Sequence, residues 1–172
     1  KPRILIIRCG LLGDTIDSTA VVKPLIEYYG DDLEIFWVAK PNLIGLFQHD
    51  NRITPLSVKY TKIPLIFNID KLKIIFESLK NPYDAIINLE VGTKFNTMVR
   101  FTKSKIKVGM PYKYVAENVA GEHRVKHQLR VIKTFYKDID EKNAYPYLIG
   151  SKIDIYKKFN ICEKYIVICP TN

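Results

Sequence analysis

The sequence is poor in cysteine and histidine, which limits the sites that it can form. Its 172 residues include three cysteines and three histidines. Cys9, Cys162 and Cys169 are odd in number and form no C-x-x-C pair, so we expect reduced, buried thiols rather than a disulfide framework. His123 and His127 stand four residues apart, but "HRVKH" lacks the glutamate of H-E-x-x-H and offers no third ligand. We therefore expect no bound metal.

Long apolar runs and nucleotide-binding glycine signatures are also missing. No apolar run reaches the roughly 18 residues that cross a bilayer. The first glycine-containing turn reads GLLGD (10–14), which is not G-x-G-x-x-G and is not followed by Gly-Lys-Ser/Thr. The second predicted strand ends in Ala39-Lys40, without the acid that binds a ribose. These absences disfavour a dinucleotide site and a P-loop.

Basic residues are in excess: 27 Lys and Arg stand against 18 Asp and Glu, a net charge of +9. Residues 94–133 alone contain ten basic and two acidic residues. Such an excess favours an anionic partner, namely nucleic acid, a phosphorylated ligand or an acidic membrane, although a solvated lysine-rich surface is an alternative. Because no RNP pattern, zinc-finger spacing or helix-turn-helix is visible, we expect no specific nucleic acid.

Short apolar runs alternate with helical patterns along the chain. We predict strands at 3–9, 33–39, 52–58, 84–89 and 106–110, and helices at 15–29, 68–80, 94–102 and 125–139. This alternation predicts an α/β fold, Rossmann-like, with a mostly parallel sheet. We expect Pro24 to kink the first helix, and Leu129, Ile132 and Phe135 to face the core from the last one.

The segment 59–80 allows two interpretations. Its helical part places Ile69, Leu72, Phe76 and Leu79 on one face, which is typical of a helix packed on a core. Its lysines are mixed with large apolar residues, which is also compatible with a membrane interface. We favour the core helix.

Two loops follow predicted strands whose carboxyl ends could meet. In open α/β sheets, ligands bind beyond the carboxyl ends of the strands. The loops 10–14 and 90–96 follow the first and fourth strands, so they could face one cleft. There Asp14 could cap the first helix, which residue type and spacing favour, or act as a catalytic base.

The ordered motifs of the chain resemble glycosyltransferase family 9, the bacterial heptosyltransferases of lipopolysaccharide core assembly. The resemblance begins at "RILIIRCGLLGDTIDSTAVVKPLIEYY" and continues through "EIFWVAKPNLIGLFQHDNRI" and "YDAIINLEVGTKFNTMVRFTKSKIKVGM". It extends to "HRVKHQLRVIKTF" and to "YPYLIG…YIVICPTN". Glu90-Val91 stands where the family commonly has Gln-Gly, and Pro-Thr-Asn replaces Pro-Gly-Ala.

The resemblance implies the N-terminal domain of a two-domain GT-B fold. Residues 1–139 would form an acceptor-binding, Rossmann-like domain, and 140–163 an interdomain linker. Residues 164–172 would be the first strand of a C-terminal donor-binding domain that the chain lacks, so we expect the fragment alone to be inactive. A non-catalytic module that binds an anionic glycan or nucleic acid is the alternative.

The resemblance also implies a reaction and a site. Heptose would pass from ADP-heptose, held mainly by the missing half without a cofactor, to an acidic inner-core sugar of lipopolysaccharide. Asp14 would be the catalytic base. The acceptor-binding residues would be Gly10, Gly13, Lys94, His123, Arg124 and Lys126. The protein would lie on the cytoplasmic face of the inner membrane, as a peripheral protein near its lipid-anchored acceptor.

Overall fold

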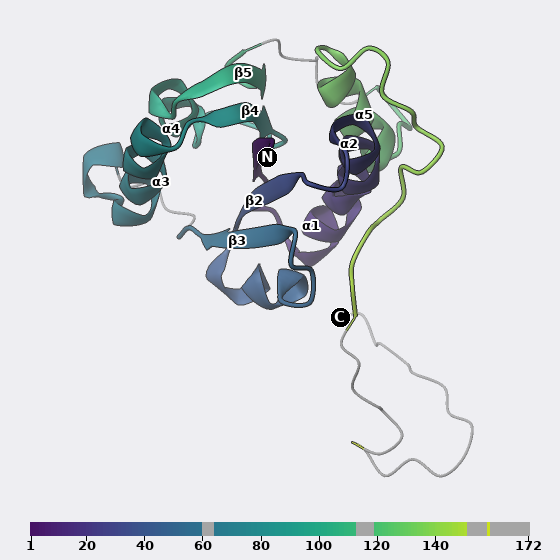
Figure 1. The fold of residues 1–172 in the computed structure, drawn as a ribbon, viewed down its shortest axis with the longest axis horizontal. Coiled ribbons are helices and arrows are strands. Elements are labelled where there is room, and N and C mark those ends of the chain that lie inside the picture. Colours follow the sequence, from purple (N-terminus) through teal and green to yellow (C-terminus); the bar gives the residue numbers. More distant parts are fainter. Residues whose placement is uncertain (60–63, 113–118, 151–157, 159–172) are drawn as a thin grey trace.

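The centre of the molecule is a parallel sheet. A computed structural model describes residues 1–59, 64–112, 119–150 and 158, and within them five strands pair in the order β3-β2-β1-β4-β5 (Figure 1). The strands are β1 (Arg3–Ile7), β2 (Glu34–Ala39), β3 (Ile53–Ser57), β4 (Tyr83–Asn88) and β5 (Ser104–Gly109). All four pairings are parallel. The predicted α/β fold and strand positions are therefore confirmed.

β1 lies at the middle of the sheet, between β2 and β4. Its apolar run has no polar alternation because helices cover both faces, and the four side chains from Ile4 to Ile7 are fully buried. Ile7 is paired with Val38 on one side and with Asn88 on the other. The carboxyl ends of the first and fourth strands therefore meet, as we expected.

The helices form two layers, one on each face of the sheet (Figure 1). One layer contains α1 (Leu12–Ser18), α2 (Val22–Tyr29) and α5 (Arg124–Lys133), with the 3₁₀ segments η1 (Thr19–Val21) and η2 (Pro41–Phe47). The other contains α3 (Ile69–Lys80) and α4 (Asn96–Phe101), preceded by η3 (Leu65–Phe67). None of the helices in the described residues is both long and apolar enough to cross a membrane.

The predicted helix 15–29 is interrupted. It is divided by η1 into α1 and α2, so the break lies before Pro24 rather than at it. Proline has no N–H to donate, and its ring clashes with the carbonyl four residues earlier, which here belongs to Ala20 in η1. The break therefore falls in the turn that precedes the proline.

The last helix is shorter than predicted. It ends at Lys133, where the hydroxyl of Thr134 donates to the carbonyl of Val131 at 2.7 Å. Leu129 and Ile132 are buried as expected, whereas Phe135 lies beyond the helix and is 38% exposed. The expectation that Phe135 shares the core face is wrong.

The buried face of α3 is not the one that its apolar spacing predicts. Lys71, Ile74, Ile75 and Ser78 are buried, while Ile69, Phe76 and Leu79 are largely exposed and Leu72 is half-buried. Lys71 can be buried because its Nζ donates to the carbonyl of Lys94 at 2.8 Å and lies 4.3 Å from the ring centre of Phe95. Local hydrogen bonds thus satisfy polar groups on the core side, and the apolar side faces outward.

The predicted linker is described in part. Residues 140–150 run along the surface, where the N–H of Tyr147 donates to the hydroxyl of Thr19 at 2.7 Å. The predicted strand at 164–172 and most of 151–163 lie outside the described residues. The division into domains stays a prediction.

Candidate functional site

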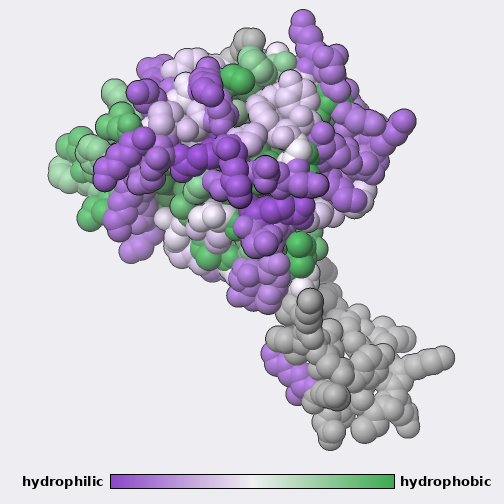
Figure 2. Space-filling view, in the orientation of Figure 1, coloured by the Kyte–Doolittle hydropathy of each residue, from purple (hydrophilic) through white to green (hydrophobic). Residues whose placement is uncertain are grey.

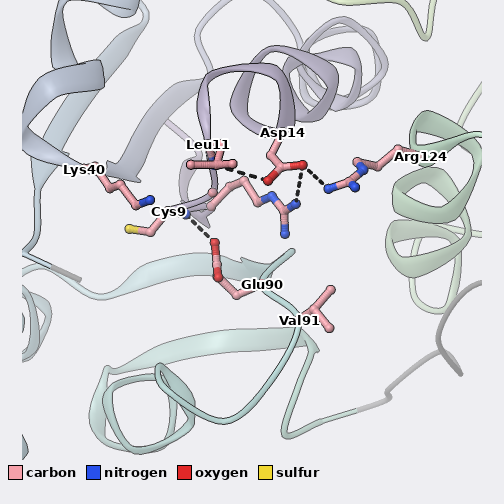
Figure 3. A pocket seen from close by; sticks show the side chains of 9 residues that line it. Cys9, Leu11, Asp14, Lys40, Glu90, Val91 and Arg124 are labelled. Carbon is pink, nitrogen blue, oxygen red and sulfur yellow. Dashed lines mark hydrogen bonds and ion pairs between the residues drawn. The ribbon is translucent and has the colours of Figure 1, made fainter. Parts of the chain in front are cut away.

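A pocket of about 310 Å³ opens where the loops after β1, β2 and β4 meet (Figure 3). Its lining residues are Arg8, Cys9, Gly10, Leu11, Asp14, Lys40, Glu90, Val91 and Arg124. Chain order reverses between β1 and β4, so the pocket lies at the topological switch point of the sheet. That is where open α/β sheets bind their ligands.

Asp14 is held on one wall of this pocket by two hydrogen bonds and a further ion pair. Its Oδ2 accepts the backbone N–H of Leu11 at 3.2 Å. Its Oδ1 accepts from Nη1 of Arg124 and lies 3.6 Å from Nη2 of Arg8. Partial burial acts to raise the pKa of Asp14, but the Leu11 hydrogen bond and the two arginine charges outweigh it and lower the pKa. Asp14 is therefore a carboxylate at neutral pH.

Asp14 caps α1 as predicted, but it does so from inside the helix and not from the residue that precedes it. The residue that precedes α1 is Leu11, and Asp14 is the third residue of the helix. From there its side chain reaches back to the N–H of Leu11, as the acid of a capping box does. An asparagine could accept the same hydrogen bond, so this role does not by itself require a charge.

Two helices approach each other in register beside the pocket. Arg124 and Gln128 stand four residues apart on α5, and Asp14 and Ser18 stand four apart on α1. Arg124 pairs with Asp14, and Nε2 of Gln128 donates to the hydroxyl of Ser18 at 2.7 Å. Ser18 and Gln128 are buried, so this second contact fixes the helices and brings Arg124 over the carboxylate.

Gly10 gives Asp14 the space that it occupies. A Cβ added at Gly10 would lie 2.5 Å from the Cβ of Asp14 and 2.9 Å from its Oδ2. At Gly13, by contrast, no described atom beyond the adjacent residues and the backbone of its own helix lies within 4 Å of an added Cβ. The glycine at position 10 therefore serves the close approach of a side chain of this same loop.

Arg8 and Glu90 line the pocket and were missed by the sequence analysis. Arg8 is 5% exposed, and its Nη1 donates to the carbonyl of Leu89 at 2.9 Å. Oε1 of Glu90 accepts the backbone N–H of Cys9 from the wall opposite Asp14 (Figure 3). The sequence did contain a signal for these residues, namely a charged residue close to the end of an apolar strand. A charged side chain there is rarely buried without a partner, so it indicates a polar contact.

The two carboxylates of the pocket differ in their electrostatics. Burial raises the pKa of Glu90, and the charge of Arg8 and the N–H of Cys9 offset this only in part. The pKa of Asp14 is lowered. Opposite shifts in neighbouring titratable groups are typical of sites with acid–base chemistry, although structural ion pairs also produce them. Burial also raises the pKa of the Cys9 thiol, to about 12, so the thiol stays protonated.

The other predicted site residues lie away from the pocket wall. Gly10, Asp14 and Arg124 are brought together, whereas Gly13, Lys94, His123 and Lys126 do not line the pocket. Lys94 contributes its carbonyl to Lys71 in the loop after β4. Nδ1 of His123 accepts the N–H of Val125 and so caps α5. Within the described residues, no three His, Cys, Asp or Glu side chains form a group that could hold a metal ion.

The arrangement can bind an anion and hold a carboxylate beside it. Arg8, Lys40 and Arg124 bring three cationic side chains to the pocket, and Asp14 and Glu90 bring two carboxyl groups. Arginine presents paired donors that match carboxylate and phosphate groups. The pocket can therefore orient an acidic ligand while a fixed carboxylate accepts a proton from it.

Comparison with known proteins gives one curated relative. No family model matches the chain. A segment of 91 residues is 34% identical to lipopolysaccharide heptosyltransferase 1 of Campylobacter coli. The match covers 51% of this chain and 25% of that protein.

Solved structures share the fold. A glycosyl transferase family 9 protein from Veillonella parvula superposes with a TM-score of 0.70 at 15% identity, covering 96% of this chain and 51% of that one. The heptosyltransferase WaaC of E. coli, solved with ADP, gives a TM-score of 0.59 at 12% identity, covering 76% of this chain and 46% of that one. The comparisons confirm the resemblance to glycosyltransferase family 9, and the chain spans about half the length of these structures.

Proposed function

We propose that the protein is a glycosyltransferase that moves heptose from ADP-heptose to an acidic inner-core sugar of lipopolysaccharide. The observation that carries the proposal is the placement of Asp14, a fixed carboxylate between Arg8 and Arg124 at the switch point of the sheet. The similarity to a heptosyltransferase of Campylobacter coli supports the choice of sugar. The solved WaaC structure that contains ADP supports a nucleotide-linked donor.

In the proposed reaction, Asp14 is the general base. An acceptor hydroxyl forms a bond to the anomeric carbon of heptose and gives its proton to a carboxylate oxygen of Asp14. The bond from that carbon to the diphosphate breaks, and ADP leaves with the electron pair. A positioned base typically contributes about 10²–10⁴ to such a rate. The hydrogen bond from Leu11 fixes the carboxylate for this transfer.

The basic residues are proposed to hold the acceptor. The side chain of Arg124 is 52% exposed, so it can turn from Asp14 toward a carboxylate or phosphate of the acceptor. That movement would free one oxygen of Asp14 to take the proton. Lys94, His123 and Lys126 would contact more distant acidic groups, and Gly10 keeps the loop narrow where the acceptor enters.

The chain spans about half the length of the solved structures that it matches, so we propose that it carries the acceptor-binding half of the protein. Residues 1–139 would form the acceptor-binding domain, 140–163 the linker, and the donor would be held mainly by a second domain. The protein would act at the cytoplasmic face of the inner membrane, where a lipid-anchored acceptor is presented.

A transfer assay with the whole protein tests the proposal. We expect ADP release and the mass of one heptose added to an acidic inner-core oligosaccharide freed of its lipid. Omitting the oligosaccharide should abolish the mass shift. Binding of the oligosaccharide without any transfer would contradict the proposal and indicate a non-catalytic module.

A further inference from the structure

We propose that the exposed apolar face of η3 and α3 binds the surface of an anionic lipid bilayer. This inference deepens the proposed function and rests on it for the lipid-anchored acceptor. We call the face the α3 patch. It consists of Ile66 (70% exposed), Phe67 (68%), Ile69 (66%), Phe76 (60%) and Leu79 (55%).

The patch is a continuous surface and not a set of scattered side chains. Ile66 and Phe67 belong to η3, Ile69 is in the first turn of α3, and Phe76 and Leu79 follow along the same helix. Figure 2 shows hydrophobic residues gathered on the side of the molecule where η3 and α3 lie, bordered by hydrophilic ones. Contiguous exposed apolar surface of this kind is typical of an interaction site.

A groove of about 420 Å³ continues the patch toward the edge of the sheet. Phe76 belongs to both, and Phe36, Leu56 and Tyr83 give the groove a mostly apolar lining. Lys73, Lys80 and Glu77 also line it. Apolar surface bordered by lysines fits a bilayer interface, where rings enter the acyl boundary and ammonium groups stay among the headgroups.

The charges near the patch favour an anionic surface. Lys59, Lys73 and Lys80 are exposed around it, against two carboxylates, Asp70 and Glu77. Asp70 is half-buried, and its Oδ2 accepts the N–H of Lys59 at 3.2 Å. The chain as a whole carries +9, so long-range attraction acts in the same direction.

The patch begins near the carboxyl ends of the strands, which is also where the pocket opens. η3 and the first turn of α3 follow β3, and loops that follow parallel strands gather at their carboxyl ends. The Nζ of Lys71 donates to the carbonyl of Lys94, which joins this turn to the loop that carries Glu90 and Val91. A bilayer that contacts Ile66, Phe67 and Ile69 would therefore present a lipid-anchored glycan at the end of the sheet that carries the pocket.

Vesicle sedimentation without sugar donor or glycan tests the patch by itself. We expect the protein to bind vesicles that contain phosphatidylglycerol and to bind vesicles of phosphatidylcholine alone far more weakly. Phe67→Ser and Ile69→Ser should each lower the partition constant about fivefold to tenfold. Lys73→Gln should lower it about fivefold.

Two control variants test whether an exposed apolar residue or a lysine outside the patch also affects vesicle binding. Val119 is 60% exposed and lies elsewhere, so Val119→Ser should leave vesicle binding unchanged, as should Lys137→Gln. Equal binding by the wild type and the patch variants would overturn the inference. So would a wild-type dimer that fails to bind vesicles and dissociates in Phe67→Ser, since the patch would then bind a second copy.

The transfer assay keeps the two proposals distinguishable. The patch variants should retain transfer to the lipid-free oligosaccharide and lose it with the acceptor embedded in vesicles. Vesicle binding without transfer to either acceptor would contradict the proposed function alone. Transfer without patch-dependent vesicle binding would contradict the patch alone.

Discussion

The guanidinium of Arg124, at the start of α5, donates to the carboxylate of Asp14, in the first turn of α1, across 110 residues of sequence. The contact gives Asp14 a second cationic partner besides Arg8. Because the pKa of Asp14 is lowered below 3.8, its pairing stabilises the fold above that pH and is lost as the pH falls through the folded-state pKa. Throughout the neutral range, Asp14 can accept a proton.

Gly10→Ala should displace Asp14 and reduce transfer. The added Cβ would lie 2.5 Å from the Cβ of Asp14, so the carboxylate must move. A misplacement of about 1 Å can cost as much as 10²-fold in rate. We expect a fall in kcat of that order in the transfer assay.

Gly13→Ala is the matched control for that substitution. Beyond the adjacent residues and the backbone of its own helix, no described atom would contact the new methyl group. Gly13 also lies inside α1, where alanine is favoured over glycine by about 0.5–1 kcal/mol. We expect a higher melting temperature and an unchanged kcat. A similar loss of kcat in both variants would show that the loop tolerates no side chain at all, against the specific role of Gly10.

Arg124→Ala should weaken acceptor binding more than donor binding. A charge-assisted contact to a carboxylate or phosphate is worth about 1–3 kcal/mol, which corresponds to roughly a fivefold to 150-fold higher KM for the acceptor. Arg100 is an exposed arginine on α4 outside the pocket, so Arg100→Ala should leave both KM values unchanged. An unchanged acceptor KM in Arg124→Ala would refute the clamp.

Glu90→Gln should raise stability at neutral pH and flatten its dependence on pH. Burial raises the pKa of Glu90 above 4.5, so the folded protein binds more protons than the unfolded chain between 4.5 and the folded-state value. The free energy of unfolding of the wild type therefore falls as the pH rises through that window. Glutamine keeps an acceptor for the N–H of Cys9 without this penalty.

Melting curves from pH 4 upward check this prediction. The two proteins should melt at similar temperatures near pH 4, and the variant should melt at the higher temperature above the window. A variant that is less stable than the wild type at neutral pH would mean that the attraction between Arg8 and ionised Glu90 exceeds the cost of burial.

Local sequence patterns predicted the fold more completely than they predicted the site. The unbroken apolar run of β1 identified a strand buried on both faces, and the loops after β1 and β4 were correctly expected to meet. The contact between Arg124 and Asp14 could not be foreseen, because it depends on where α5 packs. Arg8 was missed because it lies within the predicted strand 3–9, and Glu90 was noted only as a departure from the family pattern. The partners of both lie about 80 residues away along the chain.

The outward apolar face of α3 was missed for a different reason. Hydrophobic periodicity assigns the helix face with more apolar residues to the core. In α3, however, Lys71 and Ser78 lie on the buried face, where their side chains find hydrogen-bond partners. Lys71 donates to Lys94, and the hydroxyl of Ser78 donates to Ile75 and accepts the N–H of Lys103 at 2.9 Å. An amphipathic pattern therefore indicated the helix correctly and its orientation wrongly.

Asp14→Asn isolates the charge of the carboxylate from its shape. Asparagine can accept the N–H of Leu11, so α1 keeps its first turn. Arg8 is buried and loses an anionic partner, which should cost about 1–3 kcal/mol of stability but leave the protein folded. Asp17, on the next turn of α1 and outside the pocket, provides the control Asp17→Asn.

The kcat of Asp14→Asn in the whole protein, measured with its melting curve, tests the account most directly. We predict a folded variant whose acceptor KM is close to that of the wild type and whose kcat is lower by about 10²–10⁴. Asp17→Asn should keep the wild-type kcat. A folded Asp14→Asn variant with a kcat within about threefold of the wild type would contradict the claim that Asp14 is the base.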